Sequence, residues 1–331
     1  MPAPKAFTRF QMNPFQPGNP AVFPLTQEDE IKAQKLEREL NKAAVAKNLK
    51  AANDLYMKLS FLLSPLNHNH RLLKAKIPLF RIAMDLGPFP ELEDNLRKAS
   101  MQLDWQTPEW LEVNFLLALH FVKKGEFADA KLYISVVLEN EHVIPSPVQR
   151  KQFHEKVIAR LSDEFVIHHL KSRQSGEIDP QKLEIDVLKI LVSDRSDDDI
   201  LVSISDSTPI ETARALYLLE SFSREKSLAP LALPDMESRK GKIFVGGKLF
   251  RAFKSRARAA ICDPESPVNK AWKEKGVTSL FGGKSLLAAS VASAFNRVDL
   301  AIYAIAVPVT ALIVKTGIEA VCDATEEDFI S

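Results

Sequence analysis

The sequence predicts an all-α protein in which stacked helix pairs form a solenoid, followed by a small hydrophobic helical module. From residue 28 onward, apolar residues recur at three- and four-residue spacing for about two hundred residues, the pattern of amphipathic helices. Only 11 of the 331 residues are glycine, so few positions interrupt a helix. Turn-forming residues divide this stretch into units of about forty residues, a period typical of helical repeats.

Residues 1–27 form an arm ahead of the first predicted helix and are rich in proline. Proline lacks a backbone donor and fixes φ, so the arm cannot join a helix or a central strand. Two interpretations stay open: a disordered tail, or an extended arm whose phenylalanines dock on the protein's own body or on a partner. The arm has no continuous apolar segment, so we expect no secretory signal. Its aromatic residues are Phe7, Phe10, Phe15 and Phe23.

Three helix pairs follow the arm. A single pair cannot bury its own apolar face, so each pair has to stack on a neighbour. Ser64 and Pro65 close the first pair, and the segment GPFP, residues 87–90, makes the bend of the second. The predicted helices are 28–45 and 49–63, then 71–86 and 91–103, then 108–123 and 127–140.

The third pair carries the most specific motif in the chain, within residues 117–139. Small residues allow two helices to cross closely, and a glycine tolerates the backbone conformation of the turn between them. The motif consists of Ala118, Gly125, Phe127 and Ala130. It resembles the tetratricopeptide repeat, and residues 48–65 echo it without the turn glycine. The resemblance implies a degenerate tetratricopeptide-like solenoid that binds a protein or peptide.

More helices are expected at 148–173, 179–194 and 208–222, the last capped by Thr208 and Pro209. Between them, residues 193–209 indicate a polar turn with a short apolar run. A proline-rich break then separates two domains. The predicted organisation is an arm at 1–27, a helical-repeat domain at 28–226, a linker at 227–240 and a basic, apolar module at 241–331.

The module begins with the basic segment 239–258, in which no acid stands against its lysines and arginines. A helix from about Lys248 would place apolar residues on one face and bases on the other. Such a helix binds nucleic-acid phosphate, anionic lipid or an acidic partner, or is paired with acids elsewhere in the fold. The candidates for partner or phosphate binding are Lys248, Arg251, Lys254, Arg256 and Arg258.

Two Gly-Gly-Lys sequences, with glycines at 246–247 and 282–283, are expected to begin helices. The second resembles a phosphate-binding P-loop, but Thr278 stands where that motif requires glycine. We therefore expect no nucleotide site.

Residues 285–322 contain two apolar helices rich in small residues. The fifteen apolar residues at 300–314 would span roughly 22 Å as a helix, short of the roughly 30 Å of a bilayer core. Pro308 and Lys315 also argue against a span. A buried hairpin is expected, and insertion into a membrane is the alternative.

Charge and motif content favour a protein without catalytic chemistry. The net charge is +1, so no overall field draws the chain to nucleic acid. The histidines and the run Asp197–Asp199 lack metal-ligand spacing. Two sparse cysteines, Cys262 and Cys322, predict reduced thiols in the cytoplasm. We expect no catalytic residues, no cofactor and no metal.

The sequence thus predicts a non-enzymatic adaptor or scaffold whose helical repeats bind a protein or peptide. Self-association through the C-terminal helices is a further possibility. One alternative is an effector whose C-terminal apolar helices insert into a bilayer, which would place the chain at a membrane. Another is a nucleic-acid-binding accessory protein that uses the basic segment.

Overall fold

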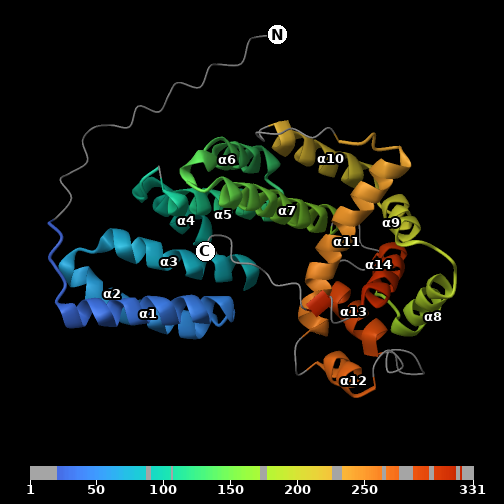
Figure 1. Ribbon diagram of the computed structural model, residues 1–331, viewed down its shortest axis with the longest axis horizontal. Helices are drawn as coiled ribbons and strands as arrows, with labels where there is room; N and C mark the ends of the chain where they lie inside the picture. Colours follow the sequence, from blue (N-terminus) through green and yellow to red (C-terminus); the bar gives the residue numbers. More distant parts are fainter. Residues whose placement is uncertain are drawn as a thin grey trace, which may run out of the picture. The chain divides into compact units, whose positions relative to one another are not determined.

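The computed structural model describes residues 21–86, 91–105, 107–171, 177–225, 233–262, 266–275, 286–297, 302–317 and 321–322. These residues form helices and turns and include no strand, which confirms the all-α class (Figure 1). The chain divides into two compact units, residues 1–92 and 93–331, and each is described by itself.

The first unit is a three-helix bundle made of α1 (Gln27–Val45), α2 (Leu49–Leu63) and α3 (Asn69–Leu86). Thr26 begins α1 because its hydroxyl accepts the Asp29 N–H. The 3-10 turn η1 (Ser64–Leu66) follows α2, where the sequence predicts the end of the first pair. The helices bury one shared core, formed by Ala33, Leu40, Ala52, Leu59, Leu63, Leu72, Ala75, Leu79 and Ile82.

The end of the N-terminal arm is attached to this bundle. The Phe23 N–H donates to the Leu66 carbonyl at 3.1 Å, and Asn67 Nδ2 donates to the Ala21 carbonyl at 3.0 Å. His68 Nε2 lies 2.9 Å from the Phe23 carbonyl oxygen. Residues 21–23 therefore lie along the turn between α2 and α3. The rest of the arm, residues 1–20, lies outside the described residues.

The second unit begins with α4 (Leu92–Gln102), α5 (Pro108–Lys124), α6 (Phe127–Glu139) and α7 (Pro147–Lys171), with the 3-10 turn η2 (Glu141–Val143) after α6. α5 is apolar on almost every side because α6 and α7 both pack against it. Gly125 ends α5 in the left-handed conformation, with φ +78°, and its N–H donates to the Phe121 and Val122 carbonyls. The predicted turn glycine has this role.

Three helices follow: α8 (Pro180–Leu191), α9 (Asp197–Asp206) and α10 (Ile210–Glu225). The prediction of a polar turn at residues 193–209 is wrong, because most of it is α9. Ser196 and Asp199 form a capping box that begins this helix, and Ile200 and Ile204 fix it to the core. Thr208 donates its hydroxyl proton to the Ile204 carbonyl at 2.7 Å, so its hydroxyl serves the helix before it.

The basic helix α11 (Arg239–Ile261) is longer than predicted, since it begins well before Lys248. The prediction that Gly246 and Gly247 begin a helix is wrong, because both lie inside α11. A Cβ at Gly246 would overlap the carbonyl oxygen of Leu201, whereas a Cβ at Gly247 would meet nothing. Gly246 therefore allows α9 to cross α11 closely. The second pair, 282–283, lies outside the described residues.

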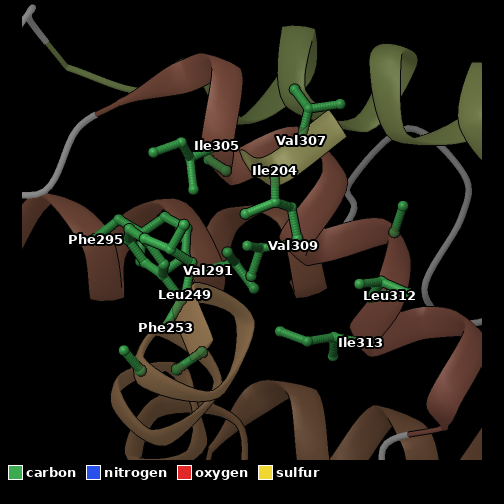
Figure 2. Packing of buried hydrophobic residues seen from close by; sticks show 14 of the residues in the cluster. Ile204, Leu249, Phe253, Val291, Phe295, Ile305, Val307, Val309, Leu312 and Ile313 are labelled. Atoms are coloured by element: carbon green, nitrogen blue, oxygen red, sulfur yellow. The ribbon is translucent and has the colours of Figure 1, made fainter. Parts of the chain in front are cut away.

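The chain continues with α12 (Pro267–Lys275), α13 (Leu286–Arg297) and α14 (Tyr303–Thr316). Residues 305–313 of α14 are all buried, including Pro308. Figure 2 shows its side chains meeting those of α9, α11 and α13. α14 contacts α8 and α9 more extensively than α13, so it is a central helix of the unit rather than one arm of an isolated hairpin. Within the described part of the chain, no helix combines the length and apolarity needed to cross a bilayer.

One hydrophobic core extends across the predicted linker at 227–240. It joins side chains of α7, α8, α9 and α10 to side chains of α11, α13 and α14. Residues 233–331 accordingly belong to the same compact unit as α4–α10.

Cys262 and Cys322 form a disulfide, with their Cα atoms 5.4 Å apart. The expectation of reduced thiols is therefore wrong. The two residues are far apart in sequence, and the packing of Val321 and Cys322 into the core that includes Ile261 at the end of α11 brings them within bonding distance. One of the two observations behind the predicted cytoplasmic location is therefore removed, because disulfides persist in oxidising compartments; the location stays a prediction from the sequence.

Candidate functional site

Lys248, the first of the predicted phosphate-binding residues, faces a buried carboxylate. Its Nζ is hydrogen-bonded to Glu220 Oε1, which also accepts the Ser162 hydroxyl proton at 2.7 Å. Glu220 is 2% exposed and Ser162 0%. Burial lowers the pKa of Lys248, and the charge of Glu220 opposes that effect. The three residues tie α7, α10 and α11 together.

Arg251 is paired in the same region. Its Nε and Nη2 donate to Asp163 Oδ1 at 2.9 and 2.8 Å, and Nη2 also donates to the Ala159 carbonyl. Burial raises the pKa of Asp163, while the neighbouring guanidinium acts in the opposite direction. Arg251 thus binds α11 to α7 with its charge already neutralised.

The remaining three candidates do not join these two. Arg258 Nη2 donates to the Cys322 carbonyl at 2.8 Å, which connects Cys322 to α11. Lys254 is half-buried, and the Arg256 side chain lies outside the described residues. The five candidates therefore do not converge on one exposed surface among the described side chains.

The start of the basic segment is paired as well. Arg239 Nη2 lies 3.0 Å from Asp199 Oδ1, and Lys242 Nζ lies 2.8 Å from Asp206 Oδ1. The acids on α9 thus face the bases on α11. This geometry fits the interpretation of segment 239–258 as a face paired with acids elsewhere in the fold.

The tetratricopeptide-like residues hold a helical hairpin together. Ala118 and Ala130 are buried between α5 and α6. The ring centroid of Phe127 lies 4.7 Å from that of Phe165 on α7. A Cβ at Gly125 would overlap the His168 ring. All four positions take part in packing, with Ala118 and Ala130 buried and Gly125 and Phe127 half-buried.

A polar cluster around Glu93, which the sequence analysis missed, joins α4 to α5 and α6. Glu93 accepts from Lys124 Nζ at 3.0 Å and Arg97 Nε at 3.1 Å, and both cations lower its pKa. The guanidinium of Arg97 also lies 5.2 Å from the centre of the Phe121 ring and donates to the Tyr133 hydroxyl. Every charge in the cluster has a partner, so the arrangement stabilises the fold.

The most exposed aromatic side chain among the described residues lies on α2. Phe61 is 76% exposed, and Met57, one turn earlier, is 51% exposed. The core of the first unit is formed by the opposite face of α2, which carries Leu59 and Leu63. We call Met57 and Phe61 the α2 stripe. The sequence contained a signal for this stripe: two large apolar residues four positions apart, on the helix face that does not carry the core residues.

The described residues also bear on catalysis and metal binding. They contain no group of three or more histidine, cysteine, aspartate or glutamate side chains placed to hold a metal ion. Ser162, with its glutamate and lysine neighbours, resembles an activated hydroxyl in composition. It is fully buried, however, and no substrate can reach it without unfolding.

The chain matches no known family, no curated protein and no solved structure at a significant level. The tetratricopeptide resemblance therefore stays a prediction from the sequence.

Proposed function

We propose that this protein is a non-enzymatic adaptor that binds a protein partner through its predicted repeat domain, and that the α2 stripe is the contact. The single observation behind this proposal is the exposure of Phe61 and Met57 on one face of a helix whose other face is buried. Large aromatic and methionine side chains are the typical anchors of protein interfaces.

The chemistry of the stripe favours an apolar helical partner. Two apolar side chains four residues apart form a ridge along a helix, and such a ridge fits the apolar face of a partner's amphipathic helix. Burying a side chain of this size contributes about 1.5–3 kcal/mol, so the pair supplies the centre of a small interface.

The two alternative functions have less support. The apolar run that motivates a membrane-acting effector is buried in α14, and insertion would require the core of the second unit to open. Four of the cations that motivate nucleic-acid binding, Arg239, Lys242, Lys248 and Arg251, are paired with carboxylates. Phosphate would have to displace these partners.

Site-specific photo-crosslinking in cells tests the proposal. A crosslinking amino acid replaces Phe61 in one chain and Leu218 in a matched control, because Leu218 is similarly exposed but lies on α10. We expect one defined polypeptide to be captured from position 61 and not from position 218. Equal capture from both positions, or none from position 61, would refute the α2 stripe as the contact.

A further inference from the structure

An acid and a base flank the α2 stripe. Asp54 and Lys58 are exposed, and neither has an ion-pair or hydrogen-bond partner within the described residues. An α-helix turns by about 100° per residue, so both charges lie within about 60° of Phe61 around the helix axis, and on the same side of it. Met57 lies on the other side of Phe61. The exposed face of α2 therefore combines an apolar ridge with one unpaired negative and one unpaired positive charge.

We propose that the partner of the α2 stripe is a second copy of this chain, which binds through its own α2 in an antiparallel pair. A two-fold dimer uses the same surface on both copies, so a contact of residue i with residue j is repeated as j with i. Asp54 and Lys58 are equally far along the helix from Tyr56. If the two-fold axis passes at the level of Tyr56, Asp54 of each copy faces Lys58 of the other.

The same arrangement brings the apolar side chains together. Met57 of one copy lies about 3 Å along the helix direction from Met57 of the other, because each is one residue from the axis. Phe61 lies opposite residue 51 of the other copy, next to Lys50. Lys50 is exposed and also lacks a partner within the described residues, so its methylene stem is available to cover the Phe61 ring.

The charges also select the orientation of the pair. In a parallel pair of α2 helices in register, Asp54 would face Asp54 and Lys58 would face Lys58, and like charges at a contact are unfavourable. Only the antiparallel pair places opposite charges together twice. This inference rests on the proposed function, because it names the partner of the surface proposed there. The dimer would join two copies of the predicted repeat domain, which suits a scaffold.

Sedimentation velocity of the purified full-length chain tests the inference. The measurements extend to about 100 μM, because an interface made by one helix from each copy is small. The test variants are Asp54→Lys and Lys58→Asp, studied alone and as an equal mixture. The matched controls are Lys35→Asp and Glu39→Lys on α1, whose side chains have the same four-residue spacing and likewise no partner in the described part of the chain.

We expect the parent chain to dimerise and each test variant alone to raise the dimer Kd at least about tenfold, because like charges then face each other. In the mixture, opposite charges again face each other at both contacts when the two different variants pair. The mixture should therefore dimerise with a Kd within about threefold of the parent value. The two α1 controls should behave like the parent chain.

A parent chain that stays monomeric, or a mixture that associates no better than either variant alone, would overturn the inference. Self-association that neither Asp54→Lys nor Lys58→Asp weakens would also overturn it, because another surface would then join the copies. The photo-crosslinking experiment separates this inference from the proposed function. Capture of a different polypeptide from position 61 would overturn only the pairing of two copies, whereas no capture from that position would refute the α2 stripe as a contact.

Discussion

Gly246 and Gly247 are neighbours on α11 with opposite structural requirements. A side chain at Gly246 would overlap the Leu201 carbonyl of α9, while the space around Gly247 is open. We predict that Gly246→Ala destabilises the second unit by about 1–3 kcal/mol through steric overlap. Gly247→Ala should stabilise it by about 0.5–1 kcal/mol, because alanine favours a helix. Urea unfolding followed by tryptophan fluorescence measures both, since every tryptophan lies in this unit. Changes of the same sign would contradict the proposed crossing.

Arg71 gives the first unit a defined response to acid. Its guanidinium donates to Glu30 at 2.7 Å and to Glu37 at 2.6 Å, which joins α3 to α1. The Arg71 hydrogen bond lowers the pKa of Glu30 below 4.5. The stabilisation by ionised Glu30 is therefore present above about pH 4.5 and lost as the pH falls through the lower folded value.

We predict that Glu30→Gln weakens the first unit at neutral pH by less than about 1 kcal/mol, since the partly exposed pair is screened by solvent. The difference from the parent chain should shrink as the pH falls below about 4.5. Hydrogen exchange of α1 peptides, corrected for intrinsic rates, measures it, and Asp54→Asn on the exposed side of α2 is the control. A difference that grows in acid would show that Glu30 is not stabilised as an anion.

At the scale of elements, α11 is held to α7 and α10 by buried charges. We predict that Lys248→Met destabilises the second unit by about 3–5 kcal/mol, because it leaves Glu220 buried without its counter-charge. Adding Glu220→Met should recover most of that loss, and Lys254→Met should have little effect. Tryptophan-monitored unfolding measures all three. A double variant no more stable than the single one would refute the coupling.

The sequence predicted most helices because their ends carry local signals. Gly125 was predicted at the turn between two helices, and the structure places it there; Thr26 and Thr107, which begin α1 and α5, are local signals that the sequence analysis did not use. The ends of α1 and α5 differ from prediction by a single residue. Such signals act within a few residues, so a single sequence is enough to find them.

The sequence-based predictions failed where contacts between residues far apart in the chain determine the structure. The length of α11 depends on Gly246, which looks like a helix start but permits the approach of α9. The ion pair between Arg251 and Asp163 joins residues 88 positions apart, and no local pattern reports it. The missed helix α9 has a different cause. The capping box of Ser196 and Asp199 is a local sequence pattern, but residues 193–209 were interpreted as a polar turn because of their run of aspartates.

At the scale of the molecule, the disulfide closes a loop that contains α12, α13 and α14. Its cysteines are 60 positions apart, and a crosslink over such a loop stabilises by about 4 kcal/mol. We predict that the variant with Cys262→Ser and Cys322→Ser loses about 2–5 kcal/mol from the second unit and leaves hydrogen exchange of α1 unchanged. Loss of protection in α1 as well would contradict the division into two units. When the chain with both cysteines intact is unfolded without reductant, an alkylating reagent should modify neither cysteine. Both should react once a reductant is added.

The central claim is that a partner binds at the α2 stripe, and the most direct measurement is its equilibrium affinity. The polypeptide captured from position 61 is purified and titrated against the parent chain, Phe61→Asp and Leu218→Asp. Charging a central anchor costs about 2 kcal/mol or more, so Phe61→Asp should weaken binding at least about 30-fold while Leu218→Asp leaves it unchanged. Equal affinity for the parent chain and Phe61→Asp would contradict the claim.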